Sequence, residues 1–373
     1  MNPLELQIYL RSGKTPADLE LELGIKNRQH GKYPELYQFK YNQIDSPTSH
    51  PIVQESRGIV LDSSSNWEIV AFPFKRFANY GEGWAAPINW NKAKILAKVD
   101  GSLVILYNFK GEWLVATSGS PDASGPVGST GITFSDLIWD TFKINMGLNN
   151  PTEVKEALKS YNKDHTFMFE LCTPLNEVVV KHTKPVLVFL GGRNNITHNE
   201  YAAFDAFPGI LPVQQFHIPT DMESIQKFLE TQDGSKMEGF VVVDENFNRV
   251  KVKHPLYVTL HHLLDRNSPK SLLEIVRLGE TSEYMAYFPD MSREFQQIKD
   301  AYDNLSLELQ TFWENAPKGD RTNKEYRKTF AQLALTSKVP GCIFGLLDGK
   351  VTNAKEYLRD MNIDHLAKLL IKE

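Results

Sequence analysis

The run Lys98-Val99-Asp100-Gly101-Ser102 has residue types and spacing that suit covalent chemistry. Apolar residues precede it at 95–97 and follow it at 103–107. An Asp-Gly pair between two apolar stretches predicts a tight turn, so Lys98 is expected at the end of a strand. A lysine amine is a nucleophile only in its neutral form, and its ordinary pKa is about 10.4. The run therefore predicts a nucleophilic lysine on a rigid support, if its surroundings keep the amine neutral.

Two glutamates accompany apolar strand patterns. In Phe167-Met168-Phe169-Glu170, strand alternation places Glu170 and Met168 on one face and both phenylalanines on the other. Glu238 directly precedes Gly239 and the apolar run 240–243. A carboxylate in such a place costs free energy unless it meets a cation, a metal ion or hydroxyl donors. The alternative for Glu170 is an exposed face of a sheet.

Three cations occur in comparable patterns. Arg57 leads into the apolar stretch 59–61 through Gly58, which suits an anion site. Lys251 and Lys253 alternate with valines in the run 249–253, so they share one face of a strand. Like charges in that arrangement repel each other unless an anion lies between or above them. The alternatives are a surface ion pair for the arginine and a solvated sheet face for the two lysines.

Together these residues favour one reaction. The three cations would favour the neutral form of Lys98 and would hold the oxygens of a phosphate. The two glutamates would hold a hydrated Mg²⁺ ion, which needs few direct carboxylate ligands and offsets the charge of leaving phosphates. We therefore predict that Lys98 attacks a nucleoside triphosphate, forms a phosphoramidate with the nucleoside monophosphate and releases pyrophosphate.

Other nucleotide and metal motifs are absent from the sequence. It contains no Gly-x4-Gly-Lys-Ser/Thr loop and no Gly-x-Gly-x-x-Gly after a strand, which argues against a P-loop ATPase and a Rossmann enzyme. No His-Glu-x-x-His motif occurs, and His261-His262 is expected at a helix start rather than in a metal site. The 373 residues suffice for two domains. The net charge of −5 means that nucleic acid could be bound only by a local basic patch.

Cysteine usage and the N-terminus predict a soluble protein of a reducing cytoplasm, without a membrane partner. The two cysteines, Cys172 and Cys342, have no metal-ligand spacing and exclude a disulfide framework. The first residues lack the basic start and apolar run of a signal peptide. No apolar stretch approaches the length that spans a membrane. The oligomeric state cannot be read, so a monomer is the default.

The strand and helix patterns predict an α+β fold with antiparallel sheets, followed by an all-α part. Short apolar stretches at 58–61, 167–171, 186–190, 239–243 and 249–253 are expected to be strands, and 152–160 and 222–230 helices. After about Tyr257 the strand patterns end, and helices are expected at 268–278, 292–313, 323–338 and 353–372. The boundary is expected near 254–262, which divides the chain into a domain of residues 1–256 and a helical domain of residues 257–373.

The order of these segments resembles the covalent nucleotidyltransferase superfamily of ligases and capping enzymes. The run 98–101 looks like its motif I, 167–170 like motif III, 186–190 like motif IIIa, 238–241 like motif IV and 250–253 like motif V. Further segments resemble the phage-type RNA ligase 1 family: the surroundings of Tyr41, and the runs 55–59, 73–79, 174–176 and 257–261. The likeness extends over about residues 35–262 and implies a nucleotidyltransferase (ATP-grasp-like ligase adenylation) domain.

By this resemblance, the protein would be an ATP-dependent RNA ligase that uses ATP and Mg²⁺, with Mn²⁺ as an alternative. Lys98 would carry AMP, pass it to a 5′-phosphorylated RNA end, and the 3′-OH of another end would displace it. The catalytic residues would be Lys98, Lys251, Lys253 and Arg57, and the metal residues Glu170 and Glu238. The nucleotide-binding residues would be Tyr41, Arg57, Arg76, Lys98, Gly101, Glu170, Phe189, Val241, Lys251 and Lys253.

Two positions depart from the pattern of that family. A lysine or arginine is expected before Gly-Ser in a phosphate-contacting segment, but Ser118 precedes Gly119 here. This puts one phosphate-handling step in doubt. Arg76 stands where a lysine is usual, with Lys75 beside it as a substitute. Because arginine binds phosphate through two hydrogen bonds, we expect the enzymatic function to survive this second change.

The resemblance also bears on substrate and partners. Related DNA ligases and capping enzymes usually continue with an OB-fold, whereas helices are expected here, which favours RNA. A basic run near Tyr326 could grip single-stranded RNA or a cleaved tRNA, although a solvated helix face explains it equally well; the run comprises Lys318, Arg321, Lys324, Arg327 and Lys328. A separate kinase-phosphatase would heal damaged ends, in a bacterial or phage-infected host cytoplasm. The alternatives are a DNA ligase, a GTP-dependent capping-type enzyme, and a catalytically silent RNA-binding homologue.

Overall fold

The computed structural model describes residues 2–42, 46–201, 207–257, 269–278, 292–320 and 322–371. It divides into two compact units, Met1–Val258 and Thr259–Glu373. The division lies two residues from the predicted boundary between residues 256 and 257. The expected pair His261-His262 and the far end of the segment 257–261 lie outside the described residues.

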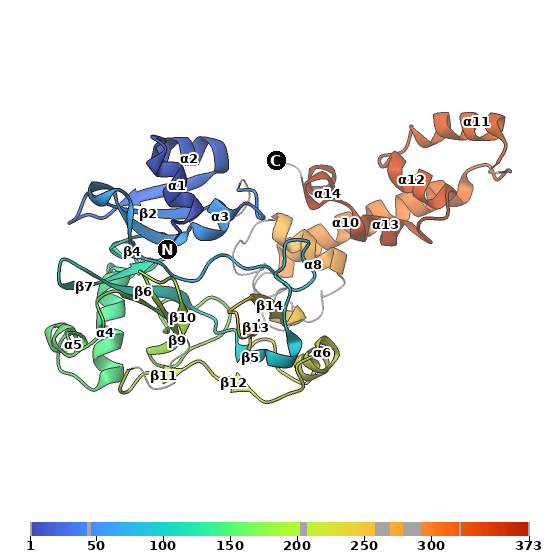
Figure 1. Cartoon of the computed structure of the whole chain (residues 1–373). Helices are drawn as coiled ribbons and strands as arrows, with labels where there is room; N and C mark the ends of the chain where they lie inside the picture. Colours follow the sequence, from blue (N-terminus) through green and yellow to red (C-terminus); the bar gives the residue numbers. More distant parts are fainter. Residues whose placement is uncertain are drawn as a thin grey trace. The chain divides into compact units, whose positions relative to one another are not determined.

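Three sheets form the framework of the first unit (Figure 1). The first has the order β1 (Ile25–Gln29), β2 (Leu36–Tyr41), β3 (Arg57–Asp62), β4 (Glu68–Ala71). The second has the order β10 (Glu200–Tyr201), β9 (Val186–Asn194), β8 (His165–Cys172), β6 (Ser102–Phe109), β7 (Glu112–Thr117), and β11 (Leu211–Pro212) pairs with β9. The third has the order β12 (Gln215–Phe216), β5 (Lys94–Ala97), β13 (Gly239–Val243), β14 (Arg249–Lys253).

All of these strand pairs are antiparallel except β11 with β9. Each strand expected from the sequence is present, and the predicted α+β class with antiparallel sheets is confirmed. The strands β1, β2, β4, β7, β10, β11 and β12 were not predicted. Three of these, β10, β11 and β12, are two residues long, and such short strands carry too little alternation to be recognised.

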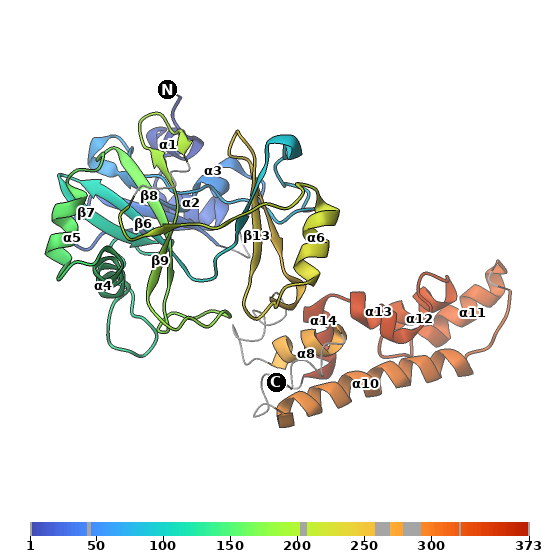
Figure 2. The same cartoon turned by 90° about the horizontal axis from the view of Figure 1, so that it is seen from below.

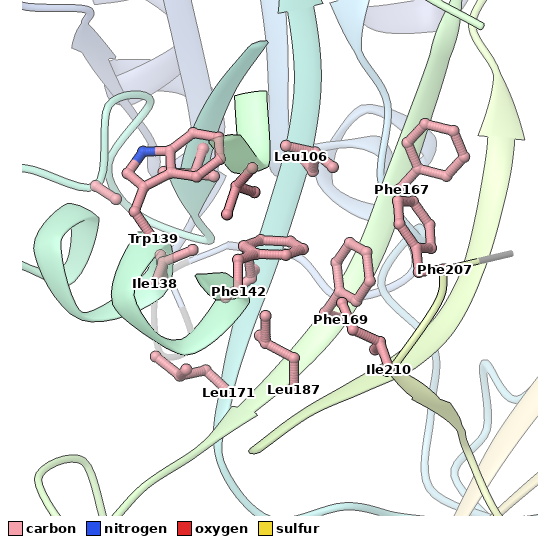
Figure 3. Close-up of a cluster of buried hydrophobic side chains, with 14 of the residues drawn as sticks. Leu106, Ile138, Trp139, Phe142, Phe167, Phe169, Leu171, Leu187, Phe207 and Ile210 are labelled. Carbon is pink, nitrogen blue, oxygen red and sulfur yellow. The ribbon is translucent and has the colours of Figure 1, made fainter. Parts of the chain in front are cut away.

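Helices cover the outer faces of the sheets. The first sheet packs on α1 (Glu5–Arg11), α2 (Pro16–Leu23) and α3 (Pro51–Glu55). The second packs on α4 (Phe134–Met146) and α5 (Pro151–Leu158), and Figure 3 shows this aromatic core, in which Phe142 meets Phe169 edge-on at 5.1 Å. The third packs on α6 (Met222–Glu230) through Ile225 and Leu229.

The second sheet is apolar on both faces. One face contributes Phe167, Phe169 and Phe189 to the core shared with α4 and α5. The other contributes Ile105 and Met168 to a core shared with the first sheet. Strand alternation therefore separates the two faces, and the glutamate of β8 lies on the face of Met168.

Among the described residues of the second unit, the regular elements are all helices (Figure 2). They are α8 (Pro269–Leu278), α10 (Ser292–Asn315), α11 (Lys324–Ala334), α12 (Pro340–Leu347), α13 (Ala354–Asp360) and α14 (Ile363–Leu370). The expectation of one helix over 353–372 is wrong, because Met361 is extended and Asn362 caps a new helix by accepting from the Asp364 and His365 amides. Within the described ranges, no helix is long and apolar enough to cross a membrane.

Candidate active site

Lys98 lies directly after β5, at the point where this strand meets β13. Its amide donates to the carbonyl of Gly239 at 2.9 Å. Its ammonium lies 2.6 Å from Oε2 of Glu238, and Lys253 Nζ lies 3.5 Å from Oε1 of the same carboxylate. Glu238 is buried, with 5% of its surface exposed. One buried carboxylate therefore holds two of the predicted catalytic lysines.

Residues 98–101 link β5 to β6, which belong to different sheets, so the tight turn predicted at the Asp-Gly pair does not form. The side chain of Asp100 fixes this segment. Its Oδ2 accepts from the amides of Val179 and Val180 at 2.9 and 2.6 Å, and its Oδ1 accepts from the Tyr257 hydroxyl at 2.7 Å. The carbonyl of Asp100 also contacts the His182 ring at 2.9 Å. These contacts join three distant segments around the lysine, and the prediction did not include Asp100 or Tyr257 among the site residues. The Lys-x-Asp-Gly run itself was the signal that pointed to Asp100.

Glycine is required at two positions beside these residues. A Cβ at Gly101 would collide with the carbonyl oxygen of Leu171, so only glycine permits the close approach of β6 and β8. Gly239 has a φ of +137°, and a Cβ there would collide with the carbonyl of Val252. The prediction places Gly101 at the nucleotide, and its position next to Lys98 is compatible with that role.

Glu170 is carried by β8 and pairs with Leu103 of β6 and Val188 of β9. Burial raises its pKa to about 7, and Lys98 and Arg57 oppose this rise. The negative charges of Glu238 and Asp100 raise it further. Two carboxylates that disfavour each other's ionisation suit a site that takes up a cation. The described part of the chain contains no group of three or more His, Cys, Asp or Glu side chains that could hold a metal ion.

Lys251 is the lysine whose surroundings most favour a neutral amine. Burial lowers its pKa to about 7, and the charges of Arg57, Lys98 and Lys253 lower it further. Its ammonium lies 5.0 Å from the centre of the Phe77 ring. A cation that is shielded from water and surrounded by other cations attracts an anion strongly.

Arg57 and Arg76 each present a guanidinium to the same region. Each has a buried Nη1 without a hydrogen-bond partner among the described residues. Burial lowers the pKa of Arg57, while Tyr41 and Glu170 raise it. Arg76 stacks on the Tyr41 ring at 4.2 Å, whereas the Lys75 ammonium lies 3.4 Å from Glu55. Arg76, rather than Lys75, is therefore the cation beside Tyr41.

The two predicted adenine contacts lie in different environments. Val241 pairs with Lys251 on one side and with Leu96 on the other, so it shares the sheet face of the site lysines. Phe189 is 2% exposed and belongs to the core shared with α4 and α5. It pairs with Phe169 on the face opposite Glu170, which disfavours its predicted contact with the nucleotide. Val188 pairs with Glu170 and lies on the face of that carboxylate.

The basic run of the second unit is partly engaged in contacts of its own. The Lys318 ammonium donates to the Trp313 carbonyl and lies 3.7 Å from the centre of that ring. Arg327 forms an ion pair with Asp348 at 3.0 Å. Arg321 lies outside the described residues. These contacts favour the solvated-face alternative for Lys318 and Arg327, and RNA binding by this run stays a prediction.

Comparisons of the sequence with known proteins find RNA ligases. The model of a family described as RNA ligase matches residues 55–257. An RNA ligase of Rhodothermus phage RM378 is 24% identical over 418 aligned positions, which cover 94% of this chain and 92% of the relative. A putative bifunctional polynucleotide kinase/RNA ligase of Autographa californica nuclear polyhedrosis virus is 29% identical over 291 positions, which cover 74% of this chain and 40% of the relative.

Two matched solved structures are RNA ligases, and each has a TM-score below 0.5. One is an archaeal ATP-dependent RNA ligase, with 12% identity, a TM-score of 0.45, and coverage of 89% of this chain and 90% of the other. A Naegleria gruberi RNA ligase mutant with ATP and Mn has 14% identity and a TM-score of 0.35. That match covers 46% of this chain, which spans about half (51%) of the Naegleria protein.

Proposed function

The chain belongs to the RNA ligase family, and from this premise we propose that it seals RNA ends with ATP through an AMP carried on Lys98. In the first step, Lys98 Nζ bonds to the α phosphorus of ATP, the bond to the β-phosphate oxygen breaks, and pyrophosphate leaves. In the second, a 5′-phosphate oxygen of RNA displaces the lysine and forms an RNA-adenylate. In the third, a 3′-OH attacks the 5′ phosphorus, and AMP leaves as the strand is joined.

The observation that carries this proposal is the contact of Lys98, Glu238 and Lys253 at the end of β5. The carboxylate positions the Lys98 ammonium with a 2.6 Å contact and holds Lys253 on its other oxygen. Lys251 shares a strand face with Lys253 and adds a further positive charge beside Lys98. The same cations would stabilise the negative charge that develops on the phosphates of ATP.

Side chains with unused donors would hold the nucleotide. The buried Nη1 groups of Arg57 and Arg76 have no partner among the described residues, and charged donors of this kind bind phosphate oxygens well. Tyr41, stacked on Arg76, and Val241, on the face of Lys251, would line the nucleoside side of the site. Val188 takes the place first assigned to Phe189.

The carboxylates Glu170 and Glu238 would hold a divalent cation. The raised pKa of Glu170 fits such a site, because a bound cation would favour the ionised form. Bound Mg²⁺ or Mn²⁺ would supply charge compensation for the leaving pyrophosphate. Few protein ligands are needed, since Mg²⁺ keeps several of its waters.

The alternative functions differ from an RNA ligase in their substrate or in lacking catalytic activity. Membership of the RNA ligase family favours RNA ends over DNA ends or a cap. A silent scaffold is disfavoured, since Lys98, Glu170, Glu238, Lys251 and Lys253 are all retained. The name of the baculovirus relative combines a kinase with a ligase, which supports our proposal that a separate enzyme heals ends for this chain. A tRNA substrate and a cytoplasmic location remain part of the same proposal.

The test is covalent labelling with α-³²P-labelled ATP and Mg²⁺, without RNA, followed by denaturing electrophoresis. The protein is first treated with pyrophosphate, which removes any AMP already bound. The wild type should retain label and Lys98→Arg should not. Lys236→Ala should label like the wild type, because that exposed lysine pairs with Asp233 in a loop. Label from GTP instead of ATP would support a capping enzyme, and absence of any label would refute the lysyl-AMP mechanism.

A further inference from the structure

Lys40, a residue to which we have so far given no role, lies against the segment 117–120. Its Nζ would be only 3.3 Å from a Cβ built on Gly119, and its Cδ would be 3.5 Å away. Lys40 is on β2, and its partner in the register with β3 is Arg57, just past a bulge. The ammonium therefore lies between the strand that carries Arg57 and a loop of a different sheet.

Neighbouring segments hold this arrangement in place. Gln38, two residues before Lys40, donates to the Thr117 carbonyl at 2.8 Å. Gly58 has a φ of +95°, and a Cβ on it would be 3.2 Å from the Cα of Ser118. The loop is thus tied to β2 and packed closely on β3. A side chain larger than that of Gly119 would press on the lysine.

Among the residues that the structure describes, the charged neighbour that acts on Lys40 is a second cation. Burial lowers the pKa of its ammonium, and Arg57 is the charged residue that lowers it further. Its side chain nevertheless remains accessible to solvent. No carboxylate contributes to the shift among the residues that the structure describes. An accessible ammonium that is surrounded by protein atoms and faces a second cation is arranged to receive an anion.

The loop that Lys40 contacts is the one that departs from the family pattern. That pattern places a lysine or arginine before Gly119, where this chain has Ser118. A lysine from β2 delivers its ammonium beside the same glycine. The positive charge beside Gly119 therefore comes from Lys40 of β2, whereas Ser118 in the loop supplies only a hydroxyl group.

We propose that Lys40 is a phosphate-binding residue that supplies, from β2, the positive charge absent at position 118. The inference rests on the proposed ligase function, because the phosphate belongs to either ATP or the 5′ end of the RNA. Both sources present the same chemistry, a tetrahedral anion with several oxygens. Arg57, the partner of Lys40, would contact the same group through its unpaired Nη1.

Binding measurements test the proposal independently of turnover. We would measure the affinity of Lys40→Ala for ATP against adenosine, and for a 5′-phosphorylated oligoribonucleotide against the same oligonucleotide with a 5′-OH. A charged hydrogen bond to phosphate corresponds to a loss of about tenfold to hundredfold. The loss should appear for one phosphorylated ligand and be absent for its unphosphorylated counterpart, which also identifies the source. Equal affinities of wild type and variant for both phosphorylated ligands would overturn the proposal.

Two further variants exclude a general charge effect. Lys26 pairs with Lys40 on β1, one strand further from Arg57, so Lys26→Ala removes the same charge from the neighbouring position. It should bind both ligands within about twofold of the wild type. The double variant Lys40→Ala/Ser118→Lys carries the positive charge on the loop residue 118 instead of on β2. It should regain most of the lost affinity for the phosphorylated ligand. Equal losses in Lys26→Ala, or no recovery in the double variant, would refute a specific role.

Ligation assays then separate this inference from the function on which it depends. The wild type and Lys40→Ala are compared in lysyl-AMP formation and in the sealing of pre-adenylated RNA without ATP. A defect in the first assay alone would assign Lys40 to ATP, and a defect in the second alone to the RNA phosphate. If the wild type forms no lysyl-AMP, the ligase proposal fails, whereas the binding measurements still decide whether Lys40 contacts a phosphate.

Discussion

The hydroxyl of Tyr257 donates a 2.7 Å hydrogen bond to the carboxylate of Asp100, two residues after the predicted nucleophile. Tyr257 is 1% exposed and Asp100 is 5% exposed, so the bond is shielded from water. The burial of this tyrosine and the neighbouring Glu238 and Asp100 charges raise the pKa of its hydroxyl, which therefore stays a donor at neutral pH. The end of the family-matched region is thereby tied to the segment that follows Lys98.

Replacing Tyr257 by phenylalanine should slow lysyl-AMP formation and lower stability. Asp100 would keep its two backbone donors but lose its bond to the tyrosine, at a cost of about 1–3 kcal/mol. The adenylation rate should fall several-fold as the segment after Lys98 loosens. Tyr107→Phe is the matched control, because Tyr107 also buries its hydroxyl in a hydrogen bond, to the Pro121 carbonyl at 2.6 Å. A similar loss of adenylation in both variants would contradict a specific role of the Tyr257 bond.

The raised pKa of Glu170 predicts that the free energy of unfolding falls as the pH rises towards neutrality. Its pKa is raised from 4.5 to about 7, so between these values the folded state binds more protons than the unfolded state. The stability that this group contributes is complete below pH 4.5 and is lost as the pH rises through 7. Urea unfolding of wild type and Glu170→Gln at pH 5 and pH 8 should show the variant gaining relative stability at the higher pH. The exposed Glu223→Gln should show no such change.

The lowered pKa of Lys251 predicts the opposite effect, a free energy of unfolding that rises with pH. Its pKa is lowered from 10.5 to about 7, so between these values the unfolded state binds more protons and stability rises with pH. Lys251→Met should therefore be more stable than the wild type at pH 6, and the difference should shrink by pH 9. The variant should also bind ATP more weakly. A stability difference that does not depend on pH would show that the ammonium is not held in a desolvated, cationic site.

Local patterns were sufficient to predict the residues that alternate along a strand. Lys251 and Lys253 share a face because β14 alternates charged and apolar residues, and the sequence displays that alternation directly. Glu170 was assigned to the face of Met168 for the same reason. In both cases the signal lies within five neighbouring residues. The tight turn predicted from the Asp-Gly pair after Lys98 is wrong, because residues 98–101 link β5 and β6, which belong to different sheets.

Other features depend on contacts that no local pattern contains. The pairing of Tyr257 with Asp100 spans 157 positions of the sequence. The contact of Lys40 with Gly119 joins two different sheets, and an isolated lysine on β2 resembles any solvated strand residue. The break at Asn362 was missed because apolar spacing continues across the cap. Tertiary packing and capping decide these points, and the sequence pattern alone leaves them open.

The burial of Phe189 on the face opposite Glu170 leads to a final prediction. The run 186–190 is apolar throughout, so alternation could not show which residues face the core. In the structure, Phe189 belongs to the aromatic core and Val188 pairs with Glu170. Phe189→Ala should lower the free energy of unfolding by about 3–5 kcal/mol. The milder Phe189→Leu should remain folded, with an unchanged affinity for ATP.

A substitution of Val188 should have the reverse effect: it should weaken ATP binding and leave stability nearly unchanged. It is only partly buried and lies on the face of Glu170, so Val188→Lys places a long cation at the proposed nucleotide site and little strain in the core. We expect weaker ATP binding, measured by calorimetry, with a melting temperature close to that of the wild type. If Phe189→Leu weakened ATP binding more than Val188→Lys did, Phe189 would contact the nucleotide after all, and the assignment of the two sheet faces would have to be reversed.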